Sequence, residues 1–230
     1  DKVSPIFTEA IRVIRTRIEK ASNDMGAKAI LITSAIPKEG KTTLSYNIAQ
    51  SLAMKDYKVI LLDCDLRNPS VAERFGLSMD KPGLSDYLMS RASLKDCLYR
   101  IPGTGLYFIS AGKPSNEASE LLASRRMRKL IEALKEEVDY IILDTAPAAM
   151  LSDASDVASY GDAAVFVVRQ DYSKVYHIME GVERLSESKL PIIGCILNNV
   201  QDGLMGDGYS GYGRYGKYGY YGSKYYYGDK

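Results

Sequence analysis

The chain has 230 residues, three cysteines and a formal net charge of +1. This length suits one α/β domain with a substantial core and is too short for two ordinary domains, and the near-zero charge excludes a whole-protein field that would attract nucleic acid. No run reaches the roughly 18 apolar residues of a membrane helix. The first residue is Asp rather than Met, as in a processed or excised part of a longer chain.

We expect the cysteines to be reduced core thiols of a cytosolic protein. Each lies in apolar sequence, and their spacing fits no metal knuckle. They are Cys64, Cys97 and Cys195.

The first predicted element is an amphipathic helix over about residues 4–22. Ser4 and Pro5 supply an N-cap and a first-turn proline. Apolar residues recur at helical spacing in Ile6, Ala10, Ile11, Ile14 and Ile18. The other face carries Glu9, Arg12 and Arg15, and on spacing alone these charges form a solvated face of i,i+3 pairs.

A buried strand over residues 30–33 leads into a loop that fits the phosphate-binding pattern. The loop runs from Ala35 through four residues to Gly40-Lys41-Thr42, where a helix begins. Such a loop directs backbone N–H groups at a β-phosphate, while Lys41 reaches the β- and γ-phosphates and Thr42 ligates Mg²⁺. We expect the loop to contact nucleotide through Ala35, Pro37, Lys38, Glu39, Gly40, Lys41, Thr42 and Thr43. Arg67, which follows the next strand, is a further expected contact.

Carboxylates follow two further strands. A strand over 58–62 ends in Asp63-Cys64-Asp65, and a strand over 140–143 ends in Asp144. Ligands of open α/β sheets gather beyond the carboxyl ends of the strands, so these acids are expected beside an Mg²⁺-nucleotide. The alternative is that Asp63 and Asp65 only cap a loop.

The remaining pattern alternates strands with helices. Short helices are expected within 69–101, a strand over 106–110, a helical region over 119–134, a strand over 163–169, a helix over 173–188 and a strand over 192–200. This alternation predicts a doubly wound, mostly parallel sheet with helices on both faces. The single histidine, His177, lies far from the phosphate motifs and is interpreted as structural, so no His-dependent mechanism is expected.

The composition changes after Gln201, and we predict a core domain over 1–201 and a flexible tail over 202–230. The tail is nearly free of aliphatic residues and cannot bury enough surface to offset its ordering entropy. Glycines alternate there with nine of the tyrosines, Tyr209, Tyr212, Tyr215, Tyr218, Tyr220, Tyr221, Tyr225, Tyr226 and Tyr227. By itself, the tail composition is typical of a low-complexity segment or of a segment that binds nucleic acid weakly. In the second case the tyrosine rings would stack on bases, with Arg214, Lys217 and Lys224 among them.

Together, the nucleotide motifs and the tail predict tyrosine phosphorylation. A tethered chain dense in phenols raises the local acceptor concentration. The expected catalytic residues are Lys41, Asp63, Asp65 and Asp144. Asp65 and Asp144, with Thr42, would hold Mg²⁺, and Asp63 would accept or polarise the tyrosine O–H.

The chain resembles the cytoplasmic catalytic domain of the bacterial tyrosine kinases that control capsular and exopolysaccharide synthesis. The resemblance spans essentially all residues and rests on several motifs together. They are Glu9-x-x-Arg12-x-x-Arg15, residues 34–43, residues 62–69, residues 118–122, residues 142–147 and the tyrosine cluster.

The resemblance implies an ATP- and Mg²⁺-dependent kinase that autophosphorylates its tail. In that family Glu9, Arg12 and Arg15 would form a subunit contact, contrary to the solvated-face interpretation, within a homo-oligomeric ring whose tails enter neighbouring sites. A transmembrane polysaccharide co-polymerase-type activator, on the same or a separate chain, would hold the kinase at the inner face of the plasma membrane. A cognate phosphotyrosine phosphatase is a further implied partner, and nucleic acid is not.

The chain departs from the family pattern at three positions. Lys38 stands where Gly is common and Ala146 where Pro is usual, while Ile36 lacks the extra lysine of the Min and partition ATPases. The last difference argues against the first alternative, a partition or positioning ATPase without kinase activity. A nucleotide-binding scaffold is the second alternative, and the retained lysine, threonine and acids argue against it.

Overall fold

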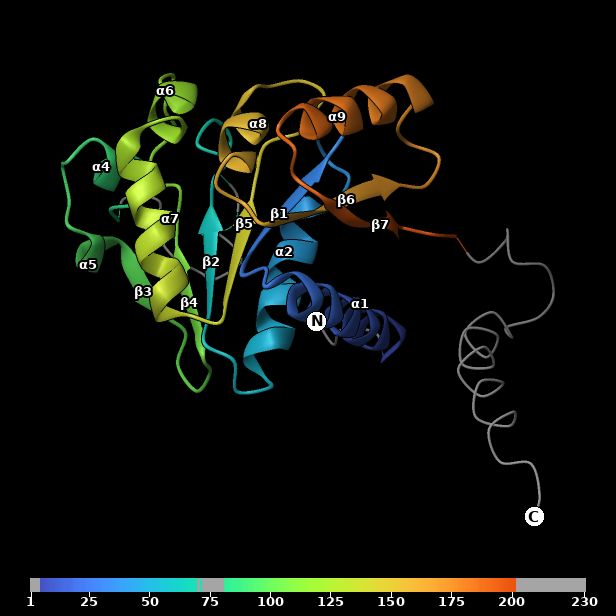
Figure 1. The fold of residues 1–230 in the computed structure, drawn as a ribbon, viewed down its shortest axis with the longest axis horizontal. Helices are drawn as coiled ribbons and strands as arrows, with labels where there is room; N and C mark the ends of the chain where they lie inside the picture. The colour runs from blue at the N-terminus through green and yellow to red at the C-terminus, as the bar shows by residue number, and fades with distance from the viewer. Residues whose placement is uncertain (1–4, 70, 72–80, 202–230) are drawn as a thin grey trace, which may run out of the picture. The chain divides into compact units, whose positions relative to one another are not determined.

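The computed structural model describes residues 5–69, 71 and 81–201, and a seven-stranded sheet forms its centre. The strands are β1 (Ala29–Ser34), β2 (Val59–Asp63), β3 (Leu98–Arg100), β4 (Leu106–Ile109), β5 (Tyr140–Asp144), β6 (Ala163–Arg169) and β7 (Ile192–Asn198). Their order across the sheet is β3-β4-β2-β5-β1-β6-β7, with β3 antiparallel to β4 and every other pair parallel (Figure 1). The predicted doubly wound, mostly parallel fold is confirmed.

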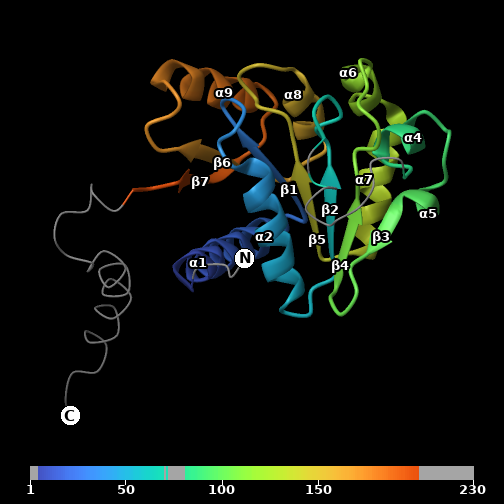
Figure 2. The ribbon, with the colours of Figure 1, turned by 180° about the vertical axis from the view of Figure 1, so that it is seen from behind.

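Helices cover both faces of the sheet. One face carries α1 (Pro5–Met25) and α2 (Lys41–Ala53), which lie in front in Figure 2. The helices on the other face are α4 (Leu84–Leu88), α5 (Leu94–Cys97), α6 (Ala118–Leu122), α7 (Arg125–Glu137), α8 (Asp153–Ala158) and α9 (Val175–Glu187).

The central strands are continuous apolar runs because both of their faces are buried. In β1, Leu31 packs into the core beneath α7, α8 and α9, whereas Ile30 and Ile32 pack into the core beneath α1 and α2. All three side chains are fully buried. The alternation of a strand thus divides one apolar segment between two cores.

Three elements differ from the sequence prediction. Residues 98–100 form the edge strand β3 rather than part of a short helix, because Tyr99 packs on Phe108 of β4. Helix α8 was not predicted. The helical region over 119–134 is two helices, α6 and α7, because Ser124 interrupts it and caps α7 by accepting a 3.1 Å hydrogen bond from Met127 N.

The prediction of three core thiols is wrong for Cys195. Cys64 and Cys97 are buried, but Cys195 is exposed because β7 is an edge strand. The N-cap at Ser4, the part of the predicted short helices at 72–80 and all nine tail tyrosines lie outside the described residues.

The chain divides into two compact units, Asp1–Asn198 and Asn199–Lys230, and only residues 199–201 of the second are described. Within the described ranges no helix is both long and apolar enough to cross a bilayer.

Candidate active site

The sequence-predicted acids and the phosphate loop meet at the carboxyl ends of three adjacent strands. The loop follows β1, Asp63 ends β2 and Asp144 ends β5, and the sheet order places β5 between the other two. The parallel register pairs Asp144 with Asp63 on one side and with Ile32 on the other. The two acids are therefore direct neighbours across the sheet.

Gly40 is required by its backbone and by its surroundings. Its φ is 99°, in the left-handed region that favours glycine. A Cβ at this position would lie 2.1 Å from Asn198 Nδ2, which donates a 2.7 Å hydrogen bond to the carbonyl oxygen of Glu39. Asn198, at the end of β7, thus supports the phosphate loop.

Glu39 holds the loop through its side chain. The carboxylate is fully buried and accepts hydrogen bonds from Ile36 N at 2.8 Å, Arg169 N at 3.1 Å and Ser173 Oγ at 2.5 Å. Protein donors occupy both of its oxygens, so Glu39 presents only backbone to a phosphate.

The rest of the predicted nucleotide contacts follow the course of the loop. Ala35 is buried at its start, Pro37 and Lys38 are exposed along it, and Thr42 and Thr43 are half-buried in the first turn of α2. Lys38 has a left-handed φ of 67°. This conformation explains why glycine suits the position.

Asp144 joins β5 to the first turns of α2. Its Oδ2 accepts a 2.8 Å hydrogen bond from Thr42 Oγ1, and its Oδ1 accepts one of the same length from Ser45 Oγ. Ser45 was not predicted, although it lies one helical turn beyond Thr42. Lys41 begins α2 and is buried, and its charge lowers the pKa values of Asp65 and Asp144 against the larger effect of burial.

The three acids have raised pKa values because they are buried together. Burial, opposed by Lys41 and the two hydroxyls, raises the pKa of Asp144 to about 6. Burial and then the charge of Asp144 raise the pKa of Asp63 well above its usual range, and burial also raises that of Asp65. A bound cation would offset the repulsion between the charged carboxylates of Asp63, Asp65 and Asp144.

The donor set fits Mg²⁺. The oxygens of Thr42, Asp65 and Asp144 are hard ligands, as Mg²⁺ prefers. Among the described residues no three His, Cys, Asp or Glu side chains form a metal site by themselves. An ion would therefore take its remaining ligands from phosphate and water, as Mg²⁺ commonly does in nucleotide sites.

Asp63 is the most enclosed of the acids. It is fully buried, and it accepts 3.2 Å hydrogen bonds from Asp65 N and from Val71 N. The alternative in which Asp63 caps the following segment agrees with these contacts, since two backbone N–H groups beyond β2 donate to its carboxylate.

Arg67 points its guanidinium at a residue that was not predicted. Its Nε donates a 2.7 Å hydrogen bond to Asp153 Oδ2 at the start of α8. Asp153 also accepts a hydrogen bond from Ser119 of α6. Asp153 belongs to no recognised motif, and no local signal marked it.

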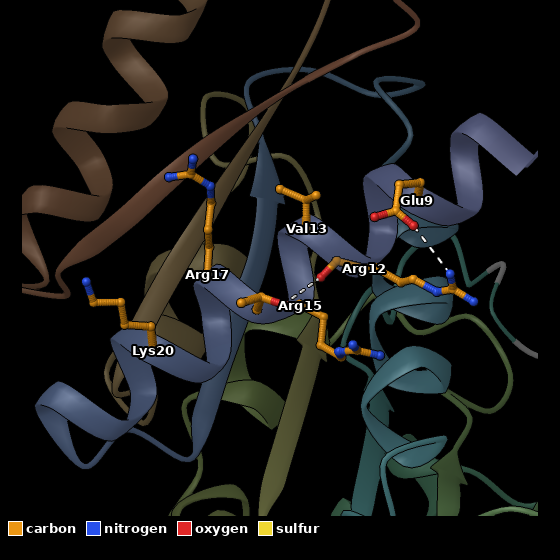
Figure 3. A pocket seen from close by; sticks show the side chains of 7 residues that line it. Glu9, Arg12, Val13, Arg15, Arg17 and Lys20 are labelled. Carbon is orange, nitrogen blue, oxygen red and sulfur yellow. Dashed lines mark hydrogen bonds and ion pairs between the residues drawn. The ribbon is translucent and has the colours of Figure 1, made fainter. Parts of the chain in front are cut away.

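The residues predicted to form a subunit contact lie on the surface of α1. A hollow there is lined by Glu9, Arg12, Val13, Arg15, Thr16, Arg17 and Lys20 (Figure 3). Glu9 and Arg12 are exposed and form a 3.3 Å ion pair. Arg15 instead packs on α2, where its NH1 donates to Ser51 O at 3.2 Å and to Ser51 Oγ at 3.1 Å. Hence Arg15 connects the two helices.

The sequence matches an AAA domain model over residues 27–192. It is 34% identical over 207 residues to the tyrosine-protein kinase CpsD of Streptococcus agalactiae, covering 90% of each chain. It is 33% identical to a putative tyrosine-protein kinase in the cps region of Klebsiella pneumoniae, covering 84% of this chain but only 26% of that protein. The chain thus spans nearly all of one relative and about a quarter of the other.

Solved structures agree in fold. The kinase domain of Escherichia coli tyrosine kinase ETK superimposes with a TM-score of 0.80 at 32% identity, covering 84% of this chain and 75% of that one. The septum site-determining protein MinD from Pyrococcus horikoshii, solved with Mg-ADP, gives a TM-score of 0.64 at 26% identity, covering 74% and 69%.

Proposed function

Because the chain belongs to the bacterial tyrosine-protein kinases, we propose that it transfers the γ-phosphoryl group of ATP to tyrosines of its own C-terminal tail. The convergence of Lys41, Thr42 and Asp144 at the ends of β1 and β5 is the observation that carries the proposal. The acceptors would be the nine tail tyrosines.

The residues of the site divide the tasks of this reaction between them. The loop N–H groups and Lys41 bind the phosphates and hold the triphosphate in line with an acceptor. Thr42, Asp65 and Asp144 would hold Mg²⁺, which supplies positive charge that neutralises the phosphate oxygens. Thr42 is oriented for this task by its bond to Asp144.

We assign the tyrosine proton to Asp63. Burial and the neighbouring Asp144 hold the pKa of Asp63 well above its usual range, and a carboxylate with a raised pKa is a stronger proton acceptor. Its carboxylate would accept or polarise the O–H as the phenol oxygen attacks.

The proposed regulatory setting is the one that the family resemblance implies. We propose a homo-oligomeric ring with Glu9, Arg12 and Arg15 in the subunit contact. A transmembrane activator of the co-polymerase type would hold the kinase at the inner membrane face, and a phosphotyrosine phosphatase would reverse the modification. The name of the Klebsiella relative, from a cps region, supports a role in capsular or exopolysaccharide synthesis.

The test combines product mapping with one substitution. Incubation with Mg-ATP should place phosphate on tail tyrosines by mass spectrometry, with the activator's cytoplasmic segment supplied if needed. Asp63→Asn should lower autophosphorylation by about 10²–10³-fold while nucleotide affinity changes by less than about threefold. Equal loss of both would make Asp63 a metal or folding residue, and ATP hydrolysis without phosphotyrosine would favour a positioning ATPase.

A further inference from the structure

Arg67 and Asp153 form an ion pair of unequal exposure at the rim of the site. Arg67 lies two residues beyond Asp65 with 36% of its side chain exposed, whereas the Asp153 side chain is 1% exposed. The pair therefore holds a partly exposed cation on a carboxylate fixed inside the protein. Asp153 and, more weakly, Asp65 raise the pKa of Arg67, which places the cation within electrostatic reach of an acid of the site.

The contacts hold the guanidinium in one orientation. Besides the bond from Nε to Asp153 Oδ2, NH2 donates to Asp153 Oδ1 at 3.1 Å and to Ser119 Oγ at 3.2 Å. Ser119 Oγ in turn donates to Asp153 Oδ1 at 2.6 Å and lies 3.2 Å from Ser152 Oγ. Two parallel N–H bonds to one carboxylate fix both the position and the plane of an arginine.

Stability alone is a weak explanation for this arrangement. A buried ion pair usually gains little over apolar packing, because desolvation offsets the attraction. The loop after β2, α6 and α8 nevertheless converge to hold a half-exposed cation next to an acid of the site. Arginine held in a fixed plane is well suited to binding phosphoryl oxygens.

We propose that Asp153 is a positioning residue for phosphoryl transfer, which together with Ser119 fixes Arg67 so that its guanidinium contacts the phosphoryl group as it moves to the acceptor. This role rests on the kinase function proposed above. In this role Arg67 contacts the phosphoryl group during its transfer, and it contributes little to the affinity for ATP in the ground state.

The test is a double-mutant cycle with Arg67→Ala, Asp153→Ala and the double variant. Each single variant should lower kcat for autophosphorylation by roughly 10- to 100-fold and leave the ATP dissociation constant within about threefold. If Asp153 acts through Arg67, the double variant should be no slower than Arg67→Ala. The control is Asp162→Ala, which removes a carboxylate paired with Lys135 and bonded to Ala29 N at the opposite end of β1. It should lower Tm and keep kcat.

Chemical rescue separates positioning from packing. Added guanidinium should restore part of the activity of Arg67→Ala, because Asp153 and Ser119 still form its binding place, and none of the activity of the double variant. If Asp153→Ala does not fold, Asp153→Asn takes its place in the cycle, since it keeps the shape and removes the charge.

The role of Asp153 would be overturned if the loss of kcat in the double variant equalled the product of the two single losses. It would also be overturned if guanidinium restored the activity of Arg67→Ala and of the double variant equally. A shift in Tm without a change in kcat would overturn it as well. Absence of phosphotyrosine from the wild-type chain, with activator supplied, would instead contradict the kinase function itself.

Discussion

Thr42 Oγ1 donates a 2.8 Å hydrogen bond to Asp144 Oδ2 across 102 positions of sequence. The bond joins the first turn of α2 to the end of β5, so two of the three predicted Mg²⁺ ligands are already adjacent. Ser45 holds the second oxygen of Asp144 from the same helix.

Replacing Thr42 should separate metal-dependent from metal-independent binding. Thr42→Val removes the hydroxyl and should lower the affinity for Mg-ATP about 10- to 100-fold, while affinity for ATP in EDTA changes by less than about threefold. Thr42→Ser, which keeps the hydroxyl, is the matched control and should retain the effect of Mg²⁺. Titration calorimetry measures both. Equal weakening with and without Mg²⁺ would remove Thr42 from the metal site.

The stability of the metal-free protein should fall as pH rises from about 4 to about 6. The pKa of Asp144 is raised to about 6 in the folded state, whereas an unfolded Asp titrates near 3.9. Between these values the folded state binds the extra proton, so Asp144 contributes a decrease in the free energy of unfolding of at most about 1.4 kcal/mol per pH unit. Above pH 6 this contribution levels off.

Urea denaturation in EDTA measures this dependence, with Asp144→Asn as the reference. The Asn variant should lack the decrease attributable to Asp144 and be more stable than wild type at pH 7. Added Mg²⁺ should narrow the difference, because a cation favours the charged carboxylate. If the free energy of unfolding of the wild type changes with pH in parallel with that of the variant, the raised pKa of Asp144 is contradicted.

Lys38→Gly should stabilise the protein slightly. Lys38 has a φ of 67°, and a side chain in the left-handed region costs roughly 1 kcal/mol, part of which is offset by the greater freedom of glycine in the unfolded chain. We expect a gain of about 0.5 kcal/mol and a rise in Tm of roughly 1–2 °C by calorimetry. Lys38→Ala removes the charge but keeps the Cβ, so it should show no such gain. If it does, charge rather than backbone strain is responsible.

Arg12 and Arg15 should differ in their effect on stability. Arg15 bonds to Ser51 and is 15% exposed, so Arg15→Ala should lower the free energy of unfolding by about 2 kcal/mol. Among the described contacts the side chain of Arg12 forms only an exposed pair with Glu9, so Arg12→Ala should change the free energy of unfolding by less than about 0.5 kcal/mol. Both substitutions should weaken assembly. An unchanged Tm in Arg15→Ala would show that the packing on α2 contributes little.

Phosphorylation of the tail should loosen the assembly. Each phosphotyrosine adds about −1.5 to −2 charge at neutral pH, so several would reverse the mildly basic character of a tail and make neighbouring tails repel. Light scattering before and after Mg-ATP should show a fall in mass. The variant with all nine tail tyrosines replaced by Phe is the control and should keep its mass. A fully modified chain of unchanged mass would contradict the prediction.

The central strands and the acids at their ends were predictable from the sequence. In β1, β2 and β5 both faces are buried, which yields the uninterrupted apolar runs that locate a parallel strand. Asp63 and Asp144 follow these runs directly, so their convergence at one edge follows from the topology.

The supporting contacts were not predictable, because they join distant segments through side chains without local signals. Asp153 meets Arg67 across 86 positions, and Asn198 meets Glu39 across 159. Likewise, β3 is only three residues long and is defined by its partner β4, so its own pattern could not separate it from a short helix. Ser45 is the exception, since helical spacing from Thr42 places it on the side of α2 that faces Asp144.

Through the contact between Arg15 and Ser51, helix α2 connects the phosphate loop at its N-terminal end with α1 at its C-terminal end. The helix begins at Lys41, in the phosphate loop, and Ser51 lies in its last turn, about 15 Å away along the axis. A shift of α2 on nucleotide binding would therefore move the hydrogen-bond partner of Arg15 on α1. If α1 forms the proposed subunit contact, thermodynamic reciprocity requires that assembly change nucleotide affinity by the same factor by which nucleotide changes assembly.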